Sequence, residues 1–364
     1  MNSFLYIRGL KSATHTVFGV SAGQKFYYDP ETGRRMPYSS GQQVKRSLLE
    51  VFLNELGVSP APITFVSDLK KDGTLKEGEP WSPCDPRHPD QLVGGWMRAQ
   101  KGGDNRTLKR RSPLSISALR PLHPLLAGMS SENLTYDRRD RPDLHVSIVR
   151  REGQEGDKAV LTDEEKVDLM KTQPGRSLFL KYIQDQSRAS GLFVYDVAVD
   201  LRTLFCVSTS ETEPEITPAI REALQAAGWQ PGLNTFGPCL LCPPEQREKL
   251  IPALAKALLD WRILTNQSRT FDLMKTLAVA VSDNANSIGA AIRAKLVPES
   301  EGSDRGPKAR PVLERIPGVD LFIAPSAAEY VFTEEERADA LASAEQEIIR
   351  RLREFDYADQ AVAV

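Results

Sequence analysis

The sequence predicts an α+β fold, and three observations lead to this class. Segments with the two-residue periodicity of strands alternate with segments that repeat apolar residues every three or four positions, as helices do, but they form no regular βαβ series. No internal repeat with a period of about 20–50 residues is visible. The 364 residues are 40% hydrophobic and 26% charged, the composition of a globular protein with a sizeable core rather than of a disordered chain or a coiled-coil rod.

The first elements are predicted to be strands followed by a helix. Residues 3–20 are rich in β-branched and aromatic side chains and predict one long strand or a bent pair, and residues 25–28 predict a short strand before a turn at 29–33. A helix then follows Ser40, with apolar residues at Val44, Leu48, Val51, Phe52 and Leu56. Its first turns carry amide and cationic side chains beside free backbone N–H groups, an arrangement that favours phosphate.

The middle of the chain predicts an insertion and then more strands. From 67 to 111 the periodicity fades and Pro, Gly and charged residues dominate, which is typical of an insertion outside the central sheet. Residues 113–119 are apolar again, and residues 144–149 alternate as a half-buried strand does. The glycines between 153 and 157 predict a hairpin tip.

Two further signals precede the last third of the chain. Thr162 and Glu165 have the spacing of a capping box and predict the start of a short helix. Residues 192–199 and 204–207 form the most apolar strand pair of the sequence. We therefore expect this pair in the middle of the main sheet.

The last third of the sequence predicts two helices, two strands and a final helix. The final helix is expected to include most of the acidic C-terminal segment. A capping box at Thr333 and Glu336 is expected to open that helix, and its apolar residues fall on one stripe. The predicted elements are helices at 218–227 and 245–263, strands at 277–281 and 319–323 on either side of a loop from 297 to 311, and the final helix burying Leu341, Ala344, Ile348, Leu352 and Phe355.

Charge is distributed unevenly along the chain, although the net charge is only −2. Residues 95–151 contain 12 Lys and Arg against 5 Asp and Glu, whereas residues 329–359 contain 10 acidic residues against 4 basic ones. The basic segment provides repeated guanidinium groups that can pair with phosphate oxygens, so single-stranded nucleic acid is a natural ligand. A solvated loop with incidental charge explains the composition equally well.

Several classes of function lack support in the sequence. No apolar run is long enough to span a membrane and the first residues do not resemble a signal peptide, so we expect a cytoplasmic protein. No motif of nucleotide-binding, zinc-protease or serine-hydrolase sites occurs. Cys239 and Cys242 have C-x-x-C spacing, but apolar neighbours favour a buried thiol pair over a metal or redox site. Among the four histidines, His145 with Asp143 is the least implausible acid–base pair.

Four segments, taken in order, resemble one protein family. The stretch Tyr38-Ser-Ser-Gly-Gln-Gln-Val-Lys-Arg-Ser-Leu48 resembles the S-G-Q-x-[ILV]-K-R signature of the Cas-seven family, the backbone subunits of type I Cascade in the RAMP superfamily. The other three are Asp90-Gln-Leu-Val-Gly-Gly-Trp-Met97, Arg110-Arg-Ser-Pro-Leu-Ser-Ile-Ser-Ala-Leu119 and Leu192-Phe-Val-Tyr-Asp-Val-Ala-Val-Asp200. The sequence departs from the family in its Asn266-Gln-Ser-Arg269 loop, where many relatives are glycine-rich, and in the insertion at 297–311.

This resemblance implies an RRM-like (ferredoxin-like) palm with an inserted fingers region and a thumb hairpin. The implied boundaries are palm at 1–66, 112–136 and 191–328, fingers at 67–111, thumb and connecting segment at 137–190, and a C-terminal helix at 329–364. In this family the copies stack as a helical filament on one CRISPR RNA, and the thumb displaces guide nucleotides at regular intervals so that the rest pair with target DNA.

The resemblance implies a non-catalytic protein of antiviral defence without a cofactor or metal. Its implied partners are CRISPR RNA, target DNA through guide pairing, other copies of itself, a Cas-five subunit and a large subunit, with no membrane. Since any spacer must be accepted, contacts to phosphate and sugar are expected rather than to base edges. The residues implied to bind RNA are Arg34, Arg35, Ser40, Gln42, Gln43, Lys45, Arg46, Arg110, Arg111, Ser112, Arg139, Asn266, Ser268 and Arg269.

A rival interpretation is a metal-dependent endoribonuclease. A type III relative of the family cuts target RNA with an acidic residue in a loop near the palm, and Asp29, Asp68 or Asp104 could take that role here. None of the three lies in a recognisable catalytic context. An enzyme that uses the Cys239 and Cys242 pair without nucleic acid is a third interpretation.

Overall fold

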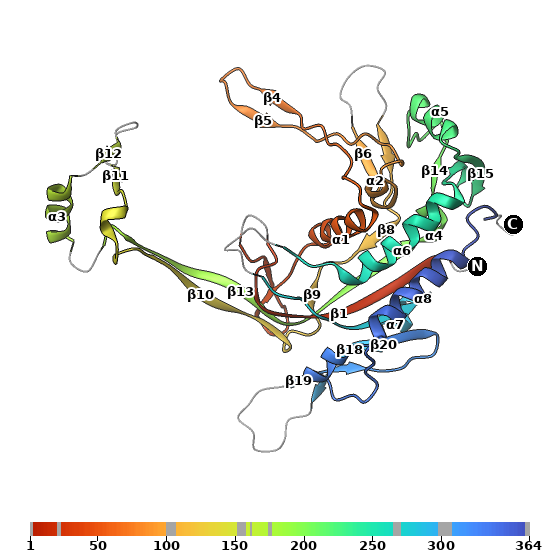
Figure 1. Ribbon diagram of the computed structural model, residues 1–364. Coiled ribbons are helices and arrows are strands. Elements are labelled where there is room, and N and C mark those ends of the chain that lie inside the picture. Colours follow the sequence, from red (N-terminus) through yellow and green to blue (C-terminus); the bar gives the residue numbers. More distant parts are fainter. Residues whose placement is uncertain are drawn as a thin grey trace. The chain divides into compact units, whose positions relative to one another are not determined.

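The structure is a computed structural model that describes residues 3–19, 23–99, 107–150, 158–160, 162–173, 177–264, 271–297 and 308–360. Figure 1 shows its helices and strands in chain order. The chain divides into two compact units, one formed by residues 1–128 and 189–364 and the other by residues 129–188. Helices and strands are mixed throughout, which agrees with the predicted α+β class.

An antiparallel sheet organises the first unit. Strand β1 (Phe4–Thr16) lies between β13 (Leu180–Asp200) and β17 (Thr276–Ser282), and it is antiparallel to both. β20 (Val319–Ile323) pairs with the other edge of β17. The strand order is β10-β13-β1-β17-β20, with β8 (Leu114–Ile116) and β9 (Arg120–Pro121) also pairing with β13 and with β10 spanning Ala127–Asp137.

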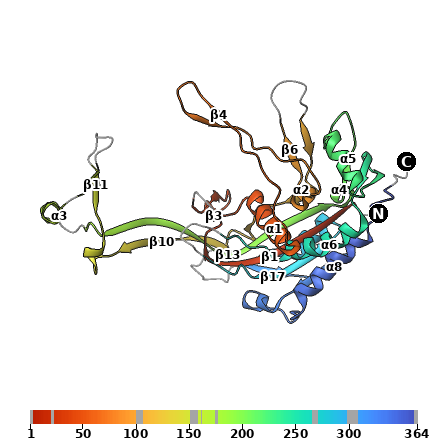
Figure 2. The same cartoon turned by 45° about the horizontal axis from the view of Figure 1, so that its top comes forward.

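Helices pack against this sheet because its strands are apolar on both faces. α1 (Gly41–Leu56), α6 (Pro244–Asp260) and α8 (Ala340–Glu354), all labelled in Figure 2, contribute to one large core cluster, whereas α7 (Ala285–Ala291) contributes to a second. Side chains of β1 alternate between the two clusters, with Leu5 and Ile7 in the first and Leu10 in the second. Of the alternatives predicted for 3–20, the structure has one long strand, which covers Phe4–Thr16.

The predicted strand pair at 192–199 and 204–207 is wrong in its second half. β13 does end at Asp200, but the Asp200 side chain then accepts a hydrogen bond from the Arg202 N–H and caps a short helix, α4 (Leu201–Leu204). The next strand, β14 (Cys206–Ser208), therefore leaves the main sheet. It pairs with β16 (Gly237–Leu241), which also pairs with β15 (Gln230–Asn234), and α5 (Pro218–Ala226) lies between β14 and β15 in sequence.

The insertion expected at 67–111 contains more regular structure than its composition predicted. Among its described residues it holds two short hairpins and one short helix, and the strands of the first hairpin are exposed throughout. The elements are β4 (Ser67–Leu69) paired with β5 (Leu75–Glu77), α2 (Pro89–Gly94), and β6 (Trp96–Arg98) paired with β7 (Leu108–Arg110). Earlier in the chain, β2 (Phe26–Tyr28) pairs with β3 (Arg35–Pro37) around the predicted turn.

The second unit contains most of β10, the first part of β13, and four short elements between them. The capping box at Thr162 and Glu165 is confirmed and opens α3 (Asp163–Lys171). The strand predicted at 144–149 begins only at β11 (Ile148–Arg150), because a 3-10 turn, η1 (Pro142–Leu144), occupies its start. β11 pairs with β12 (Lys158–Val160), and the predicted tip at 153–157 lies outside the described residues.

Two predictions for the C-terminal part are corrected. The loop expected at 297–311 is flanked by a hairpin of β18 (Ile292–Val297) and β19 (Lys308–Leu313). The acidic segment is not one helix, since a 3-10 turn, η2 (Pro325–Glu329), is followed by α8, which starts after Asp339 rather than at Thr333. The Thr333 hydroxyl instead accepts a hydrogen bond from the Glu335 N–H in a turn. Within the described residues, no helix could span a membrane.

Lys11 is an unusual member of the core. Its ammonium donates to the Thr276 hydroxyl at 2.8 Å and lies 4.8 Å from the centre of the Trp261 ring. Burial, followed by repulsion from Arg262, lowers the Lys11 pKa to about 7, and Asp260 opposes this shift. Because the unfolded lysine titrates near 10.5, folding releases a proton between these two pH values. The free energy of unfolding therefore rises as the pH increases from about 7 to 10.5. Below pH 7 the full cost of burying the charged ammonium is present.

We expect Lys11 to make the protein more stable at pH 9 than at pH 6 by about 2–3 kcal/mol, other groups aside. Urea unfolding at both pH values, for the unchanged protein and for Lys11→Met, measures this contribution as the difference between the two pH responses. The methionine side chain keeps the volume but cannot titrate. Equal pH responses of the two proteins would contradict the prediction.

Candidate nucleic-acid interface

The start of α1 is fixed by a cap and by a close backbone approach. The Ser40 hydroxyl accepts a hydrogen bond from the Gln43 N–H at 3.4 Å, which satisfies one of the free donors of the first turn. A Cβ at Gly41 would lie 2.6 Å from the Ile116 carbonyl oxygen. The glycine of the signature is therefore required for α1 to lie against the segment that contains β8.

Lys45 joins this helix to both ends of the β6–β7 hairpin. Its ammonium donates to the Gly94 carbonyl and to the Ser112 hydroxyl, each at 2.7 Å. Burial, together with repulsion from Arg110, lowers the Lys45 pKa to about 8. The sequence resemblance assigned Lys45 and Ser112 to a phosphate groove, and in the structure they are partners in one hydrogen-bond network.

Arg110 lies in the interior, although the sequence resemblance placed it beside bound RNA. The residue is 3% exposed, and its side chain donates to the carbonyl groups of Leu92, Thr203 and Cys206. Glu215 lies 3.9 Å away, and burial raises the pKa of its carboxyl group while Arg110 opposes the rise. These contacts occupy the guanidinium within the protein, so we treat Arg110 as a residue that positions its exposed neighbour.

Exposed candidates surround the start of α1. Arg111 and Gln42 are exposed, and neither side chain forms a hydrogen bond or ion pair with any residue that the structure describes. Arg46 is exposed as well, and it pairs with Glu50 at 3.0 Å. Gln43, the next residue after Gln42, is half-buried. The helix start thus presents amide and cationic groups of the type predicted from the sequence.

The β2–β3 hairpin leads directly into this surface. Ser39 and Leu119 exchange two backbone hydrogen bonds of 3.0 Å, which hold the chain after β3 against the segment between β8 and β9. Arg34 and Arg35 are exposed on the hairpin, and the Arg35 guanidinium lies 3.9 Å from the centre of the Phe26 ring. The structure therefore brings together the helix start, segment 111–119 and the hairpin, in one unit.

Four predicted RNA-binding residues do not belong to this surface as described. Arg139 lies in the second unit, where it pairs with Asp137 at 2.6 Å. Asn266, Ser268 and Arg269 lie outside the described residues. Sequence reasoning also missed Phe26 and Tyr28, which are exposed beside Arg35. The signal was present, because three consecutive aromatic residues in a strand of three cannot all face a core.

The residues considered for catalysis are scattered. Asp29 accepts two hydrogen bonds from Thr32 in the β2–β3 turn, which lower its pKa, and Asp68 lies on exposed β4. Asp104 lies outside the described residues, and His145 follows η1, where its ring contacts Phe179. Over the residues that the structure describes, no three His, Cys, Asp or Glu side chains come together as metal ligands.

The cysteines are buried, as the apolar neighbours of Cys239 and Cys242 predicted. The Cys206 thiol on the adjacent strand β14 interacts with the Cys239 thiol on β16 and lowers its pKa. Burial raises the pKa of the Cys242 thiol to about 12, so this group stays protonated at neutral pH.

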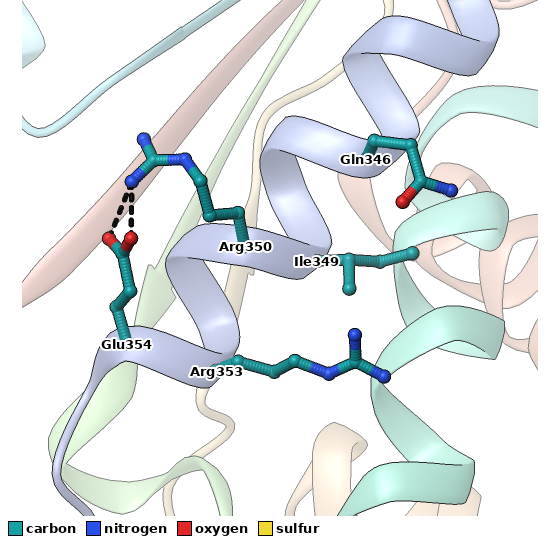
Figure 3. A pocket seen from close by; sticks show the side chains of 5 residues that line it. All are labelled: Gln346, Ile349, Arg350, Arg353 and Glu354. Carbon is teal, nitrogen blue, oxygen red and sulfur yellow. Dashed lines mark hydrogen bonds and ion pairs between the residues drawn. The ribbon is translucent and has the colours of Figure 1, made fainter.

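A shallow depression on α8 offers no comparable interface. Figure 3 shows Arg350 and Glu354 joined along the helix, while Gln346 and Arg353 extend to the other side. Arg353 pairs with Glu248 of α6 at 2.7 Å. The charges of this face therefore neutralise one another.

Comparison with solved structures finds similar chains at low sequence identity, among them two from CRISPR RNA-guided complexes. No family model matches the sequence, and none of the curated proteins does. A chain of a solved "CRISPR RNA-guided surveillance complex, pre-nicking" is 10% identical, with a TM-score of 0.42 over 96% of this chain and 89% of that chain. A chain of a "CRISPR RNA-guided surveillance complex" is 11% identical, with a TM-score of 0.37 over 96% and 84% of the two chains.

Proposed function

We propose that this protein is a non-catalytic RNA-binding subunit of a type I CRISPR effector complex. It polymerises along a CRISPR RNA, holds the guide and target strands through phosphate and sugar contacts, and assembles with a Cas-five subunit and a large subunit. The four ordered sequence segments that resemble the Cas-seven family support this assignment.

The order of the sheet supports an RRM-like palm. Along the chain, the elements β1, α1, β10, β13, α6 and β17 form a βαββαβ series, and in the sheet the strands lie in the order β10-β13-β1-β17. This is the arrangement of the ferredoxin-like fold. In it, β10 and β13 are the second and third strands, and they continue into the unit formed by 129–188. We propose that this unit is the thumb.

The observation that carries the proposal is the surface around the start of α1. The exposed residues Gln42 and Arg111 are presented beside the capped helix start, and Arg34 and Arg35 are presented on the hairpin that leads to it. These groups are hydrogen-bond donors suited to phosphate oxygens, and a subunit that must accept every guide sequence needs contacts of this kind.

The first experiment is to co-express the chain with a CRISPR RNA and purify it at raised salt. Regular RNA-containing filaments in electron microscopy, an absorbance ratio that shows bound RNA, and intact target RNA after incubation with magnesium are the expected results. A monomer free of nucleic acid would refute the proposed function. Cleavage of target RNA at regular intervals would instead establish the metal-dependent endoribonuclease.

We expect the double variant Arg34→Gln/Arg111→Gln to weaken RNA binding equally for all sequences. Each lost phosphate contact should reduce the slope of log affinity against log salt by about 0.7, because fewer counterions are released from single-stranded RNA. Titrations of the full chain with labelled RNA at four salt concentrations measure this slope. Lys45 is less suitable for the test, since its replacement would also release Gly94 and Ser112.

The matched control is Arg315→Gln, which removes an exposed arginine paired with Glu335 elsewhere in the chain. It should leave affinity and salt slope unchanged. If affinity were lost for one RNA sequence only, or were lost to the same extent in the control, Arg34 and Arg111 would not be part of the RNA interface.

A further inference from the structure

We propose that the β2–β3 hairpin is a stacking surface for unpaired nucleobases. The inference rests on the proposed function and deepens it, because it adds base stacking to an interface otherwise made of phosphate and sugar contacts. The surface consists of Phe26, Tyr28 and Arg35, with Lys25 and Arg34 beside it.

All three aromatic rings of β2 are exposed, and two of them share one face. On that face Phe26 is 38% exposed and Tyr28 65% exposed, whereas on the other face Tyr27 is 39% exposed and lies opposite Met36, which is 1% exposed. Phe26 and Tyr28 lie two positions apart on the same face, with ring centres 5.6 Å apart and rings perpendicular. A perpendicular contact covers at most one of the two faces of the Tyr28 ring, so a planar base can stack on the other.

The guanidinium of Arg35 extends the same surface. It lies 3.9 Å from the centre of the Phe26 ring and directly opposite Tyr28 in the strand register. Its charge is not neutralised by an ion pair with any residue that the structure describes. Arginine stacks on bases as well as on aromatic rings, so the three side chains form one platform of π faces and positive charge.

The charge around the platform favours nucleic acid over a protein partner. Lys25 and Arg34 are exposed at its border, while the Asp29 carboxylate is held by Thr32 in the turn and Glu31 is the remaining acidic side chain of the hairpin. The core of a protein interface is depleted of charge, whereas single-stranded RNA presents bases and phosphates together.

The platform is also placed next to the phosphate-binding surface of the proposal. The Tyr38 N–H donates to the Lys25 carbonyl at 3.1 Å, and the Tyr27 and Tyr38 rings are in contact on the opposite side of the hairpin from Phe26. Ser40, the cap of α1, follows two residues later. One strand of RNA can therefore contact the helix start with its backbone and the hairpin with a base.

The test compares Phe26→Leu/Tyr28→Leu with the unchanged full chain on two single-stranded probes. One probe is an oligoadenylate of about 12 nucleotides, and the other has the same sugar–phosphate chain without bases. We expect the variant to lose about 10-fold or more in affinity for oligoadenylate and less than about 2-fold for the abasic chain. The salt slope should not change, since no phosphate contact is removed.

A second variant, Phe26→Trp/Tyr28→Trp, keeps two π faces and should bind oligoadenylate within a few fold of the unchanged protein. Equal losses of the leucine variant on both probes would overturn the stacking role. Sedimentation without RNA would also overturn the stacking role if the unchanged chain self-associated and the leucine variant did not. The hairpin would then be a contact between two copies of the chain. If the unchanged protein binds neither probe, the proposed function itself fails.

Discussion

Replacing Arg110 by methionine is expected to lower the free energy of unfolding by about 3–5 kcal/mol. The guanidinium is the donor for three carbonyl groups that come from α2, from α4 and from β14. Methionine fills much of the volume but donates nothing, so these oxygens stay buried without their partner. Glu215 also loses the nearby positive charge, so the pKa of its carboxyl group rises further.

Arg111→Met is the matched control for this prediction. The two arginines are adjacent in sequence, but Arg111 is exposed and its side chain forms no hydrogen bond or ion pair with any residue that the structure describes. We expect a change within about 0.5 kcal/mol for the control. Urea unfolding at pH 7 measures both variants, and an Arg110→Met protein as stable as Arg111→Met would show that the interior network does not hold the β6–β7 hairpin.

Gly9→Ala is expected to destabilise the protein by about 3 kcal/mol. Gly9 lies opposite Tyr195 in the β1–β13 register, and a Cβ at this position would lie 2.1 Å from the tyrosine ring. The ring has little freedom to move, because its hydroxyl donates to the Leu258 carbonyl at 2.9 Å and its centre lies 4.9 Å from that of Trp261. The added methyl group must therefore strain β1 or displace the ring.

Gly289→Ala makes the same chemical change where space is available. Gly289 is in α7, and a Cβ there would meet no atom within 4 Å. A gain of about 0.5–1 kcal/mol is expected from the higher helix propensity of alanine. Thermal and urea unfolding should therefore show a lower free energy of unfolding for Gly9→Ala and a higher one for Gly289→Ala. A neutral Gly9→Ala protein would mean that β1 and β13 pair in another register.

Patterns contained within one segment of the sequence predicted the elements that are determined by residues of the same segment. The helix of Val44 and Leu48 was predictable because its cap and its apolar stripe lie within one segment, and the same is true of the capping box at Thr162. β20 was predicted with its exact bounds, since residues 319–323 form a short apolar run between turns. Each of these elements can be recognised from neighbouring residues alone.

Elements that depend on distant partners were predicted less well. The run at 204–207 was assigned to the main sheet because its composition fits any buried strand, whereas its actual partner, β16, lies more than 30 residues later. The candidate site shows the same limit. Its residue types followed from sequence, but whether Arg110 faces solvent depends on carbonyl groups at Thr203 and Cys206, which no local pattern reveals.

The contact of Lys45 with Gly94 and Ser112 has a consequence for how the protein can be engineered. Both acceptors flank the β6–β7 hairpin, so one ammonium group holds together the points where the chain enters and leaves this hairpin. Doubling the length of chain between Arg98 and Leu108 would add only about 0.6 kcal/mol of closure entropy. The connection between Arg98 and Leu108 is therefore a suitable place to insert a peptide tag or a reporter domain.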